Sequence, residues 1–487
     1  MNKESARFKR VLLVSGRFYK GRYRLSIHPL AGLGYIAEVL LQAGLDVAVL
    51  DMNLQYTYDD LERKITSYRP DLIGFTVMTH GYKEIYSLIT RLKTNHPEIK
   101  IVVGGPHIST FRQMVLRECP AIDYGIILEG DCSVVKLCKG DDFESIQGFM
   151  YRKDADIIVN PHENFITDLD CLPFATFRSF ELSLYPAKQI GIVTSRGCPY
   201  DCIYCPVLSA IGKEFRQRSA ENVVKEIEYW YLRGYRDILI LDDNFSLLKK
   251  RVEDICRLLA EKNLKGIRLK CPNGIRADRV DYNLLKKMKE VGFDMIAFGV
   301  EAATEHVLKN IKKRESLATI EESVKNACHL GFDVDLFFLI GSPGERFCDV
   351  EKSFSFALRY PVRSAKFYNI IPFPTTELYD WLEKNKLLLH SQDYILNNAS
   401  HFVNEPYFYT PEMNREERIK AFKIGSRIER IIRRRYIERK IKLPVGLGYL
   451  ASLVLSTPFM EGLLSNNSSL IRIKEKLKSN FCRSMGN

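Results

Sequence analysis

Short apolar runs alternate with amphipathic segments along the first 140 residues. Strands are predicted at 10–14, 46–51, 72–77, 101–103 and 124–128, and helices at 32–43, 61–68 and 82–94. Strands that alternate with helices indicate a doubly wound parallel sheet, so residues 1–140 are expected to form one α/β domain. Ligands of such sheets bind at the carboxyl ends of the strands, in the connecting loops.

A second series of strands and helices is predicted between residues 188 and 385. Its strands are predicted at 190–194, 237–241, 267–270, 295–300, 334–340 and 365–371, and an amphipathic helix at 218–233. Between the two series, residues 141–187 contain two short strands at most and several prolines, so they are expected to be a linker. Residues 386–487 are expected to form a helical, basic C-terminal domain.

The C-terminal region combines a basic helix with an uncharged segment. Residues 415–442 carry twelve Lys and Arg against four Glu, and isoleucines lie on or near one face of the predicted helix. Residues 443–460 then lack any charge but contain Pro444 and Pro458, which makes them marginal for spanning a bilayer. Two interpretations stay open: a buried cap on the preceding domain, or a segment that lies on a membrane surface.

Composition narrows the class of protein. The chain has 487 residues, 46% of them hydrophobic, which is enough for several packed domains. Much of its net charge of +12 lies in the C-terminal segment, so no nucleic-acid surface is expected. The N-terminus lacks a signal-peptide core, and most of the twelve cysteines show no paired spacing. A reducing cytoplasm is therefore the expected compartment, with membrane association as the second possibility.

Three cysteines lie close together on one loop. Cys198, Cys202 and Cys205 have the spacing C-x3-C-x2-C and directly follow the strand predicted at 190–194. Gly197 favours a tight loop there. Three thiolates can hold three corners of a [4Fe–4S] cluster and leave the fourth iron open. A disulfide would leave one cysteine over, and a structural zinc ion would need a fourth ligand nearby.

With this loop placed after a buried strand, the chain resembles the radical S-adenosylmethionine (SAM) enzymes. In that family the open iron binds the amino and carboxylate groups of SAM, and an electron from the cluster cleaves SAM to methionine and a 5′-deoxyadenosyl radical. The resemblance implies that residues 188–385 form the family's partial (βα)6 barrel, whose chemistry lies at the strand ends. It also implies low oxygen and an external reductant such as flavodoxin or ferredoxin.

The resemblance assigns three residues to the nucleoside part of SAM. Tyr204, just before the third cysteine, is expected beside the adenine. Glu301, at the end of the strand predicted at 295–300, occupies the place of the carboxylate that binds the ribose. Gly341 opens the sequence Gly-Ser-Pro-Gly-Glu after another strand and is expected to make backbone contacts near the adenine.

Three further residues are assigned to the methionine part. Asp242 and Asp243 stand where the family often has a Gly-Gly-Glu segment that receives the amino group. The sequence departs from that segment, so the choice between the two aspartates stays open. Arg276 fits a polar contact to the methionine carboxylate or to the substrate.

The N-terminal domain resembles the Rossmann-like cobalamin (B12) domain that precedes the radical SAM core in one large subgroup. Glycines in its strand-end loops permit a large flat ligand to approach the backbone. The residues expected to bind cobalamin are Pro29, Gly32, Thr76, Thr79, Gly104, Gly105, Pro106, His107, Glu129 and Gly130. As in most members of that subgroup, the Asp-x-His-x-x-Gly motif that supplies a cobalt-ligating histidine elsewhere is absent. Cobalt is therefore expected without a histidine ligand.

Together the resemblances imply a cobalamin-dependent radical SAM enzyme. The most frequent chemistry of the subgroup is methylation of an unactivated carbon, here of a small-molecule or lipid-like substrate. Cyclisation or rearrangement by a cobalamin-dependent enzyme stays open. A cobalamin-free methylthiotransferase acting on RNA is a third alternative, but Cys119, Cys132 and Cys138 lack the strand-end placement of a second cluster. A non-catalytic cobalamin carrier would not need the cysteine loop.

Overall fold

The computed structural model describes residues 6–16, 28–398, 400–401, 403–441, 445–457, 460 and 470, with only the backbone at 445 and 447. The chain divides into two compact units. The first contains residues 1–187 together with 207–216, and the second contains 188–206 together with 217–487. The chain therefore leaves the second unit directly after the cysteine loop and returns ten residues later.

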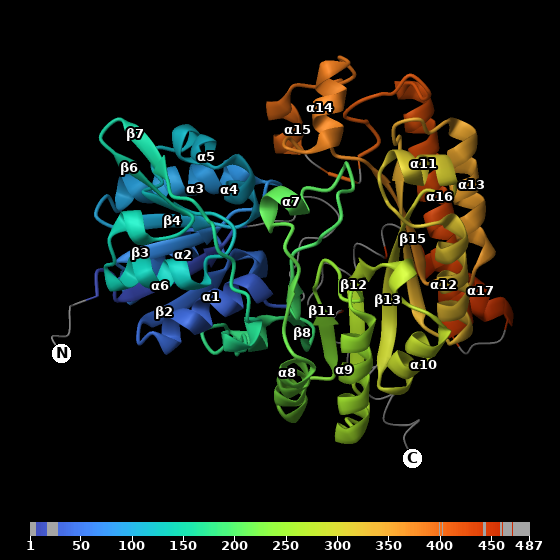
Figure 1. Cartoon of the computed structure of the whole chain (residues 1–487), viewed down its shortest axis with the longest axis horizontal. Coiled ribbons are helices and arrows are strands. Elements are labelled where there is room, and N and C mark those ends of the chain that lie inside the picture. The colour runs from blue at the N-terminus through green and yellow to red at the C-terminus, as the bar shows by residue number, and fades with distance from the viewer. Residues whose placement is uncertain are drawn as a thin grey trace. The chain divides into compact units, whose positions relative to one another are not determined.

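The first unit is built on a sheet that lies between helices (Figure 1). Its strands are β1 Arg10–Ser15, β2 Asp46–Asp51, β3 Leu72–Thr76, β4 Lys100–Gly104, β5 Tyr124–Ile126, β6 Phe149–Lys153 and β7 Asp156–Val159. They are ordered β2-β1-β3-β4-β5-β6-β7, and β1 to β5 run parallel. The expected doubly wound sheet is confirmed, because the β1 run Val11–Val14 is buried on both faces.

The segment expected to be a linker differs from that expectation. Strands β6 and β7 lie within residues 141–187 and extend the sheet: β6 pairs antiparallel with β5, and β7 pairs antiparallel with β6. Phe149 and Met150 are completely buried, whereas Arg152 and Lys153 are exposed. The sequence placed two strands at 148–152 and 156–159 within this segment, close to where β6 and β7 lie. A strand with only one buried end has a weak periodic signal, so the sequence did not indicate that these strands pair with the sheet.

Helices follow most strands of the first unit. They are α1 Ala31–Gln42, α2 Tyr58–Tyr68, α3 Tyr82–Asn95, α4 Pro106–Phe111, α5 Gln113–Glu118, α6 Asp131–Lys139 and, from the returning segment, α7 Val207–Ala210. Helices α4 and α6 begin within a few residues of the carboxyl ends of β4 and β5, and α1 follows the longer connection after β1. The loops expected to bind cobalamin therefore lie at one edge of the sheet.

The second unit contains an open parallel sheet in the order β15-β14-β13-β12-β11-β8. Its strands are β8 Gln189–Ile192, β11 Asp237–Ile240, β12 Arg268–Ile275, β13 Phe293–Glu301, β14 Asp333–Ile340 and β15 Ser364–Asn369. Six parallel strands with two free edges are the expected partial barrel, so this part of the fold prediction is confirmed.

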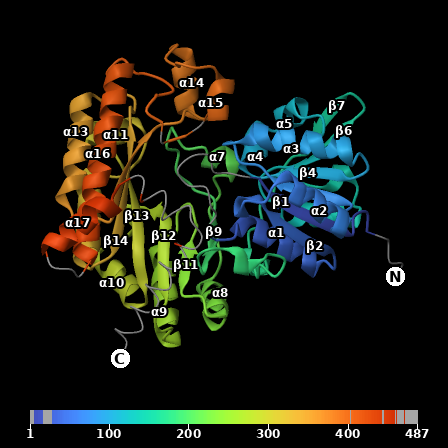
Figure 2. The same ribbon diagram turned by 180° about the vertical axis from the view of Figure 1, so that it is seen from behind.

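Helices cover the outer face of this sheet (Figure 2). They are α8 Ala220–Leu232, α9 Lys249–Lys262, α10 Tyr282–Glu290, α11 Glu305–Asn310, α12 Leu317–His329 and α13 Phe347–Arg359. Helices α14 Glu377–Lys384 and α15 Gln392–Asn398 lie apart from that face, at one end of the unit (Figures 1 and 2). Helices α8, α10, α12 and α14 have side-chain caps that accept backbone hydrogen bonds and fix where each helix begins; these caps are Ser219, Asp281, Ser316 and Thr376.

The basic helix α16, Arg415–Lys440, packs against β15 and α13 and so belongs to the second unit (Figures 1 and 2). Its buried stripe is Arg418, Ala421, Phe422, Gly425, Ile428 and Ile432. Ile419, Ile424 and Ile431, which the sequence placed near the apolar face, are only half-buried. The stripe is rotated because small residues, not isoleucines, allow close contact with Phe367 of β15.

Helix α17, Val445–Leu455, follows and packs against α16. Among the described residues, no helix is long and apolar enough to cross a membrane. Lys442 and the basic run expected at 472–478 lie outside the described residues.

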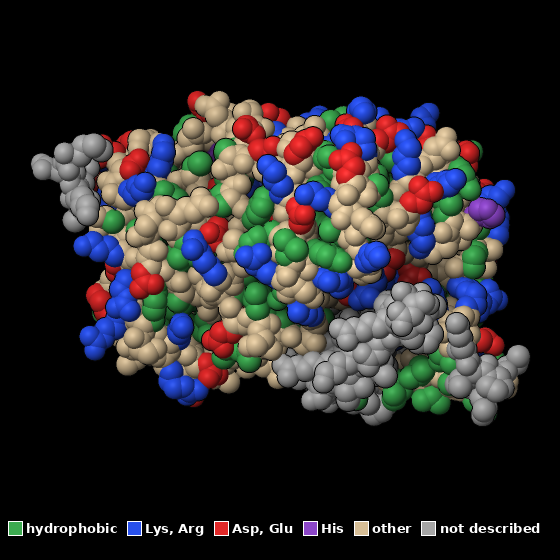
Figure 3. Space-filling model, turned by 90° about the horizontal axis from the view of Figure 1, so that it is seen from below, with side chains coloured by type: hydrophobic (Ala, Val, Ile, Leu, Met, Phe, Trp, Pro, Cys, Tyr) green, Lys and Arg blue, Asp and Glu red, His purple; other side chains and the backbone are tan. Residues whose placement is uncertain are grey.

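Exposed charges of both signs are mixed on the surface. On the face drawn in Figure 3, Lys and Arg side chains lie among Asp and Glu. Surface pairs such as Lys249 with Asp281 and Arg257 with Glu261 show the same mixing. On that face the net positive charge of the chain does not form one continuous patch.

Candidate active site

The cysteine loop is held at several points of its backbone. Gly197 has a φ of +83°, a conformation that favours glycine, directly before Cys198. The Ile203 N–H donates to the carbonyl of Ile311 at 3.2 Å, and the Leu378 N–H donates to the Ile203 carbonyl at 2.9 Å. All three cysteines are half-buried and free of disulfides. The loop therefore presents three thiols from a fixed backbone.

Asp242 fastens the beginning of this loop. The N–H and hydroxyl of Thr194 and the hydroxyl of Ser195 all donate to its carboxylate, each at 2.6 Å. Asp242 is buried, and these three hydrogen bonds satisfy its carboxylate. Asp243 is half-buried, and burial together with Asp242 raises the pKa of its carboxyl group to about 6. Of the two aspartates, Asp243 keeps the freer carboxylate.

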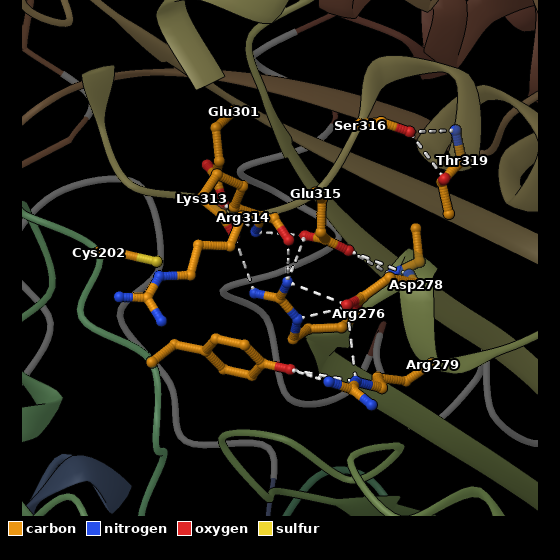
Figure 4. Close-up of polar contacts among 12 residues, drawn as sticks. Cys202, Arg276, Asp278, Arg279, Glu301, Lys313, Arg314, Glu315, Ser316 and Thr319 are labelled. Atoms are coloured by element: carbon orange, nitrogen blue, oxygen red, sulfur yellow. Dashed lines mark hydrogen bonds and ion pairs between the residues drawn. The ribbon is translucent and has the colours of Figure 1, made fainter. Parts of the chain in front are cut away.

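A buried lysine lies between two glutamates beside the loop (Figure 4). The Lys313 Nζ is 3.1 Å from Glu301 Oε1 and 3.4 Å from Glu315 Oε2. Burial alone would lower the pKa of this ammonium group, but Glu301 and Glu315 hold that pKa above its usual value. Glu301 also binds Tyr204, and burial and this carboxylate raise the pKa of the tyrosine hydroxyl. Glu301 thus brings together Tyr204 of the cysteine loop and Lys313, which are far apart in the sequence.

Arg276 joins the end of β12 to the loop between α11 and α12. Its guanidinium donates to the carbonyls of Lys313 and Arg314, both at 3.1 Å, and to Asp278 at 2.9 Å. Glu315 completes the connection by accepting the Ala277 N–H at 2.7 Å. These bonds fix the backbone that carries Lys313. Most of the Arg276 donors are therefore used within the protein.

The electrostatic environment suits three metal-bound thiolates. Burial raises the pKa values of Cys198 and Cys202, which alone would keep both thiols protonated. The Lys313 and Arg276 cations act in the opposite direction at Cys202, whose sulfur lies 3.7 Å from the Lys312 carbonyl. No three His, Cys, Asp or Glu side chains in the described part of the chain are grouped around a single-ion site. Three thiols on one loop beside buried cations fit an iron–sulfur cluster better than a mononuclear metal.

Gly341 follows β14 and is enclosed by its own chain. Its φ is +86°, its N–H donates to Glu345 at 2.7 Å, and its carbonyl accepts from Arg418 at 3.2 Å. A Cβ atom here would lie 2.1 Å from the Arg418 guanidinium carbon. Both backbone polar groups of Gly341 thus take part in hydrogen bonds that shape the turn, and its expected contact near the adenine stays a prediction.

In the first unit, most of the residues expected to bind cobalamin lie at the carboxyl edge of the sheet. These are Pro29, Gly32, Thr76, Thr79, Gly104, Gly105, Pro106 and Gly130. Gly32 is exposed, and a Cβ placed on it would meet nothing within 4 Å. Gly105 packs close to the Thr76 hydroxyl, with only 3.0 Å to a Cβ. Small residues thus leave backbone open at this edge, which fits a large planar cofactor.

His107 and Glu129 are turned into the protein instead. The His107 ring stacks on Tyr82, its Nε2 lies 3.1 Å from the Tyr86 hydroxyl, and burial lowers its pKa to about 3. Glu129 pairs with Arg216 at 2.5 Å and accepts the Ile166 N–H at 2.9 Å. Both side chains therefore hold loops in place, and their expected contact with cobalamin stays a prediction.

Sequence reasoning missed several residues of these sites. Lys313 lies in the run Lys-Lys-Arg-Glu at 312–315, which has the pattern of a solvated loop. Lys312 and Arg314 both have a φ of +55°, and this backbone turns the lysine between them inward. His80 directly follows Thr79 in a cobalamin loop, and its buried Nδ1 has no hydrogen-bond partner among the described residues.

Comparison with known proteins agrees with these two sites. Residues 192–357 match the radical SAM superfamily, and residues 17–137 match the B12 binding domain. An uncharacterized methyltransferase of Pyrococcus horikoshii is 30% identical over 370 residues, 74% of this chain and 80% of the relative. The hopanoid C-3 methylase of Methylococcus capsulatus is 25% identical over 80% of this chain and 74% of its own length.

Among solved structures, the cobalamin-dependent SAM radical enzyme OxsB, with aqua-cobalamin and SAM bound, shares the fold. Its TM-score is 0.74 at 16% identity, covering 98% of this chain and 75% of that one. Fold and site together define an iron–sulfur enzyme with a second, corrin-binding domain. The chain belongs to the radical SAM superfamily, in the group that carries a B12-binding domain. It is a radical SAM enzyme, and its cofactors are a [4Fe–4S] cluster, SAM and cobalamin.

Proposed function

We propose that the enzyme methylates an unactivated carbon of a small-molecule or lipid-like substrate. The observation that carries this proposal is the presence in one chain of the cysteine loop with its buried cations and of the B12 domain. The two curated relatives described above, a methyltransferase and a methylase, support it. When bound, the cluster supplies the electron that splits SAM, and cobalamin supplies the transferable methyl group.

The residues of the second unit would divide the binding of SAM among them. Cys198, Cys202 and Cys205 would hold three irons, and Lys313 would attract the methionine carboxylate beside Cys202. Asp243 would accept the amino group, because Asp242 is already occupied by the loop. The role of Arg276 would be to hold the backbone of Lys313, since its donors point at the carbonyls of residues 313 and 314.

The nucleoside would lie beside Glu301 and Tyr204. Their mutual hydrogen bond places a carboxylate for the ribose next to an aromatic ring for the adenine. In the first unit, Gly32, Thr76, Gly104 and Gly105 would let the corrin approach the sheet edge. The proteins expected to deliver the electron are an external flavodoxin or ferredoxin.

The apolar face of α17 supports a lipid-like substrate. Leu450 and Val454 are 60% and 55% exposed, and Tyr449 and Leu453 lie beside them on the same short helix. Helix α16, which precedes it, ends in the basic residues Arg439 and Lys440. Arg439 donates to the carbonyls of Pro361 and Val362, and Lys440 pairs with Asp333, so the exposed apolar side chains of α17 carry this support more than the two cations do.

The test uses anaerobically reconstituted enzyme, a chemical reductant and SAM labelled in its methyl group. Candidate substrates are taken from membrane lipid extracts and polar metabolite pools. Transfer of the label to a carbon of a product, with deoxyadenosine formed alongside, supports the proposal. A product that contains no label but has a new ring or a rearranged skeleton would establish the alternative chemistry and overturn methylation.

A further inference from the structure

A completely buried arginine connects the C-terminal helix to the end of β14. Arg418 lies in the first turns of α16, outside the range that matches the radical SAM family. Its guanidinium donates to the carbonyls of Ile340 and Gly341 at 3.0 and 3.2 Å. The guanidinium carbon lies 3.9 Å from the centre of the Phe408 ring, over which the group is placed. Both partners that enclose the turn from this side thus come from residues beyond 400.

The same turn is held on its other sides. Glu345 accepts the N–H groups of Gly341 and Ser342 at 2.7 and 3.1 Å. Glu412, again from the C-terminal region, accepts the Gly344 N–H at 3.3 Å. Residues 341–345 are therefore clamped by one internal carboxylate and by two side chains of the C-terminal region.

Burying Arg418 and Glu345 together costs the folded protein desolvation free energy. Burial lowers the pKa of Arg418 to about 9 and raises the pKa of Glu345 to about 8, so both charged forms are disfavoured where they lie. Within the described residues, Arg418 Nε and Glu345 Oε1 are buried without a hydrogen-bond partner. An apolar side chain would fill the same space at a lower cost in desolvation. The guanidinium therefore points to a role in positioning the turn.

The turn is linked to the cysteine loop by hydrogen bonds. Asn310 donates to the Pro343 carbonyl at 3.0 Å. The next residue, Ile311, accepts the Ile203 N–H from the cysteine loop, and the Lys312 carbonyl lies beside the sulfur of Cys202. A displacement of the turn at 341–345 would consequently be transmitted to the segment that carries Lys313.

We propose that Arg418 and Glu412 make the C-terminal region part of the SAM site. They are positioning residues: they hold the turn after β14 in the shape that lets SAM bind between it, Glu301 and the cluster. This inference rests on the proposed placement of SAM at the carboxyl ends of β13 and β14. It extends the SAM site beyond the six strand–helix repeats to a helix at the far end of the sequence.

The experiment compares Arg418→Met with Arg439→Met. Arg439 lies on the same helix and also donates to two carbonyls, those of Pro361 and Val362, both at 2.9 Å, but at the other end of β15. SAM binding is measured by the change in the EPR spectrum of the reduced cluster during titration with SAM. We expect at least a tenfold weaker SAM affinity for Arg418→Met, with unchanged iron and sulfide content, and an unchanged affinity for Arg439→Met.

Glu412→Gln serves as a milder variant if Arg418→Met folds poorly. It removes charge from the acceptor of the Gly344 N–H at an exposed position, and we expect a two- to threefold loss of SAM affinity. In Arg418→Ala, the added Gly341→Ala should cost less SAM affinity than it does in the unchanged protein, because the overlapping guanidinium is gone.

Two outcomes would overturn the proposal separately from the proposed function. If SAM changes the cluster spectrum of the unchanged enzyme and that of Arg418→Met at the same concentration, Arg418 does not position the site. Equal losses of SAM affinity in Arg418→Met and Arg439→Met would show a general effect of helix packing. If SAM leaves the spectrum of the unchanged enzyme unaltered, the placement of SAM itself is wrong.

Discussion

The ammonium group of Lys313 lies 3.1 Å from the carboxylate of Glu301, and both side chains are buried. Glu301 reaches this position with a φ of +62° at the end of β13. A non-glycine residue in this conformation is strained, so the surrounding contacts must hold it there. The pair fixes the ammonium group of Lys313 near Cys202, where we propose that the SAM carboxylate binds.

Replacing Lys313 by Met is expected to destabilise the protein by about 3–5 kcal/mol, because Glu301 would be left as a buried carboxylate without a cation and Glu315 would keep only Arg276. SAM affinity should fall as well, since the attraction for its carboxylate is lost. Urea unfolding and EPR titration with SAM measure the two effects. Lys312→Met is the matched control: its exposed pair with Glu377 contributes at most about 1 kcal/mol. Equal effects in both variants would contradict the assigned role of Lys313.

The cysteine loop gives a second prediction. Replacing Cys198, Cys202 or Cys205 by Ala should abolish both the cluster and deoxyadenosine formation, because three thiolates are the smallest set that holds the cluster with one iron open. Cys271→Ala is the control, since this cysteine is completely buried in β12 and lies outside the loop. Iron, sulfide and deoxyadenosine are measured after anaerobic reconstitution. A full cluster in the Cys202 variant would contradict the assignment of this loop as the site of the cluster.

The strands could be predicted because most of them are buried on both faces and form continuous apolar runs. Strand β2 was predicted with its observed bounds, Asp46–Asp51. Strand β12 was predicted to end at 270 but continues to Ile275. Its second half contains Pro272 and Gly274, which signal a turn, yet Ile275 still pairs with Phe298 after a break in register. Tertiary pairing here overrides the local signal.

The site was predicted less completely. A sequence motif indicates which residues lie at a strand end, but it does not show which of their carboxylates already accept hydrogen bonds from the protein. Asp242 and Asp243 are adjacent in sequence, and only the structure shows Thr194 and Ser195 bound to the first of them. Arg418 lies more than 70 residues beyond the turn it holds, in a helix whose pattern indicates a basic surface. No spacing rule connects such positions.

Asp243 leads to a pH prediction. Its carboxyl group has a pKa of about 6, raised by burial and by Asp242, and only the ionised form accepts the SAM amino group well. SAM affinity should therefore be constant above about pH 7 and weaken about tenfold for each unit below pH 6. Asp243→Asn should bind SAM weakly at every pH with its cluster intact, whereas Asp242→Asn should lower cluster content. A pH profile that persists in Asp243→Asn would assign the titration to another group.

The cobalamin site predicts the state of the cobalt. Both ring nitrogens of His107 lie near hydroxyl groups, those of Tyr86 and Thr79, at 3.1 and 3.4 Å. We therefore expect the EPR spectrum of the bound Co(II) form to lack nitrogen splitting from an axial ligand. A clear nitrogen triplet would contradict this expectation. Its loss in His80→Ala, and its retention in His107→Ala, would then identify His80 as the ligand.

The exposed face of α17 gives the last prediction, which tests the membrane surface and the lipid-like substrate. The notion that Leu450, Leu453 and Val454 pack inward does not fit their exposure of 60%, 37% and 55%. Full-length enzyme should therefore float with vesicles that contain anionic lipid, and less so at high salt. The double variant Leu450→Glu, Val454→Glu should stay in the soluble fraction, because two carboxylates oppose burial in the headgroup region and are repelled by anionic lipid. The matched control is Leu232→Glu on α8, a leucine that is 75% exposed far from α17 in sequence, and it should float like the unchanged enzyme. If the unchanged enzyme itself stays soluble, α17 makes no membrane contact, and the support it gives to a lipid-like substrate is lost while the cluster and SAM assignments are unaffected.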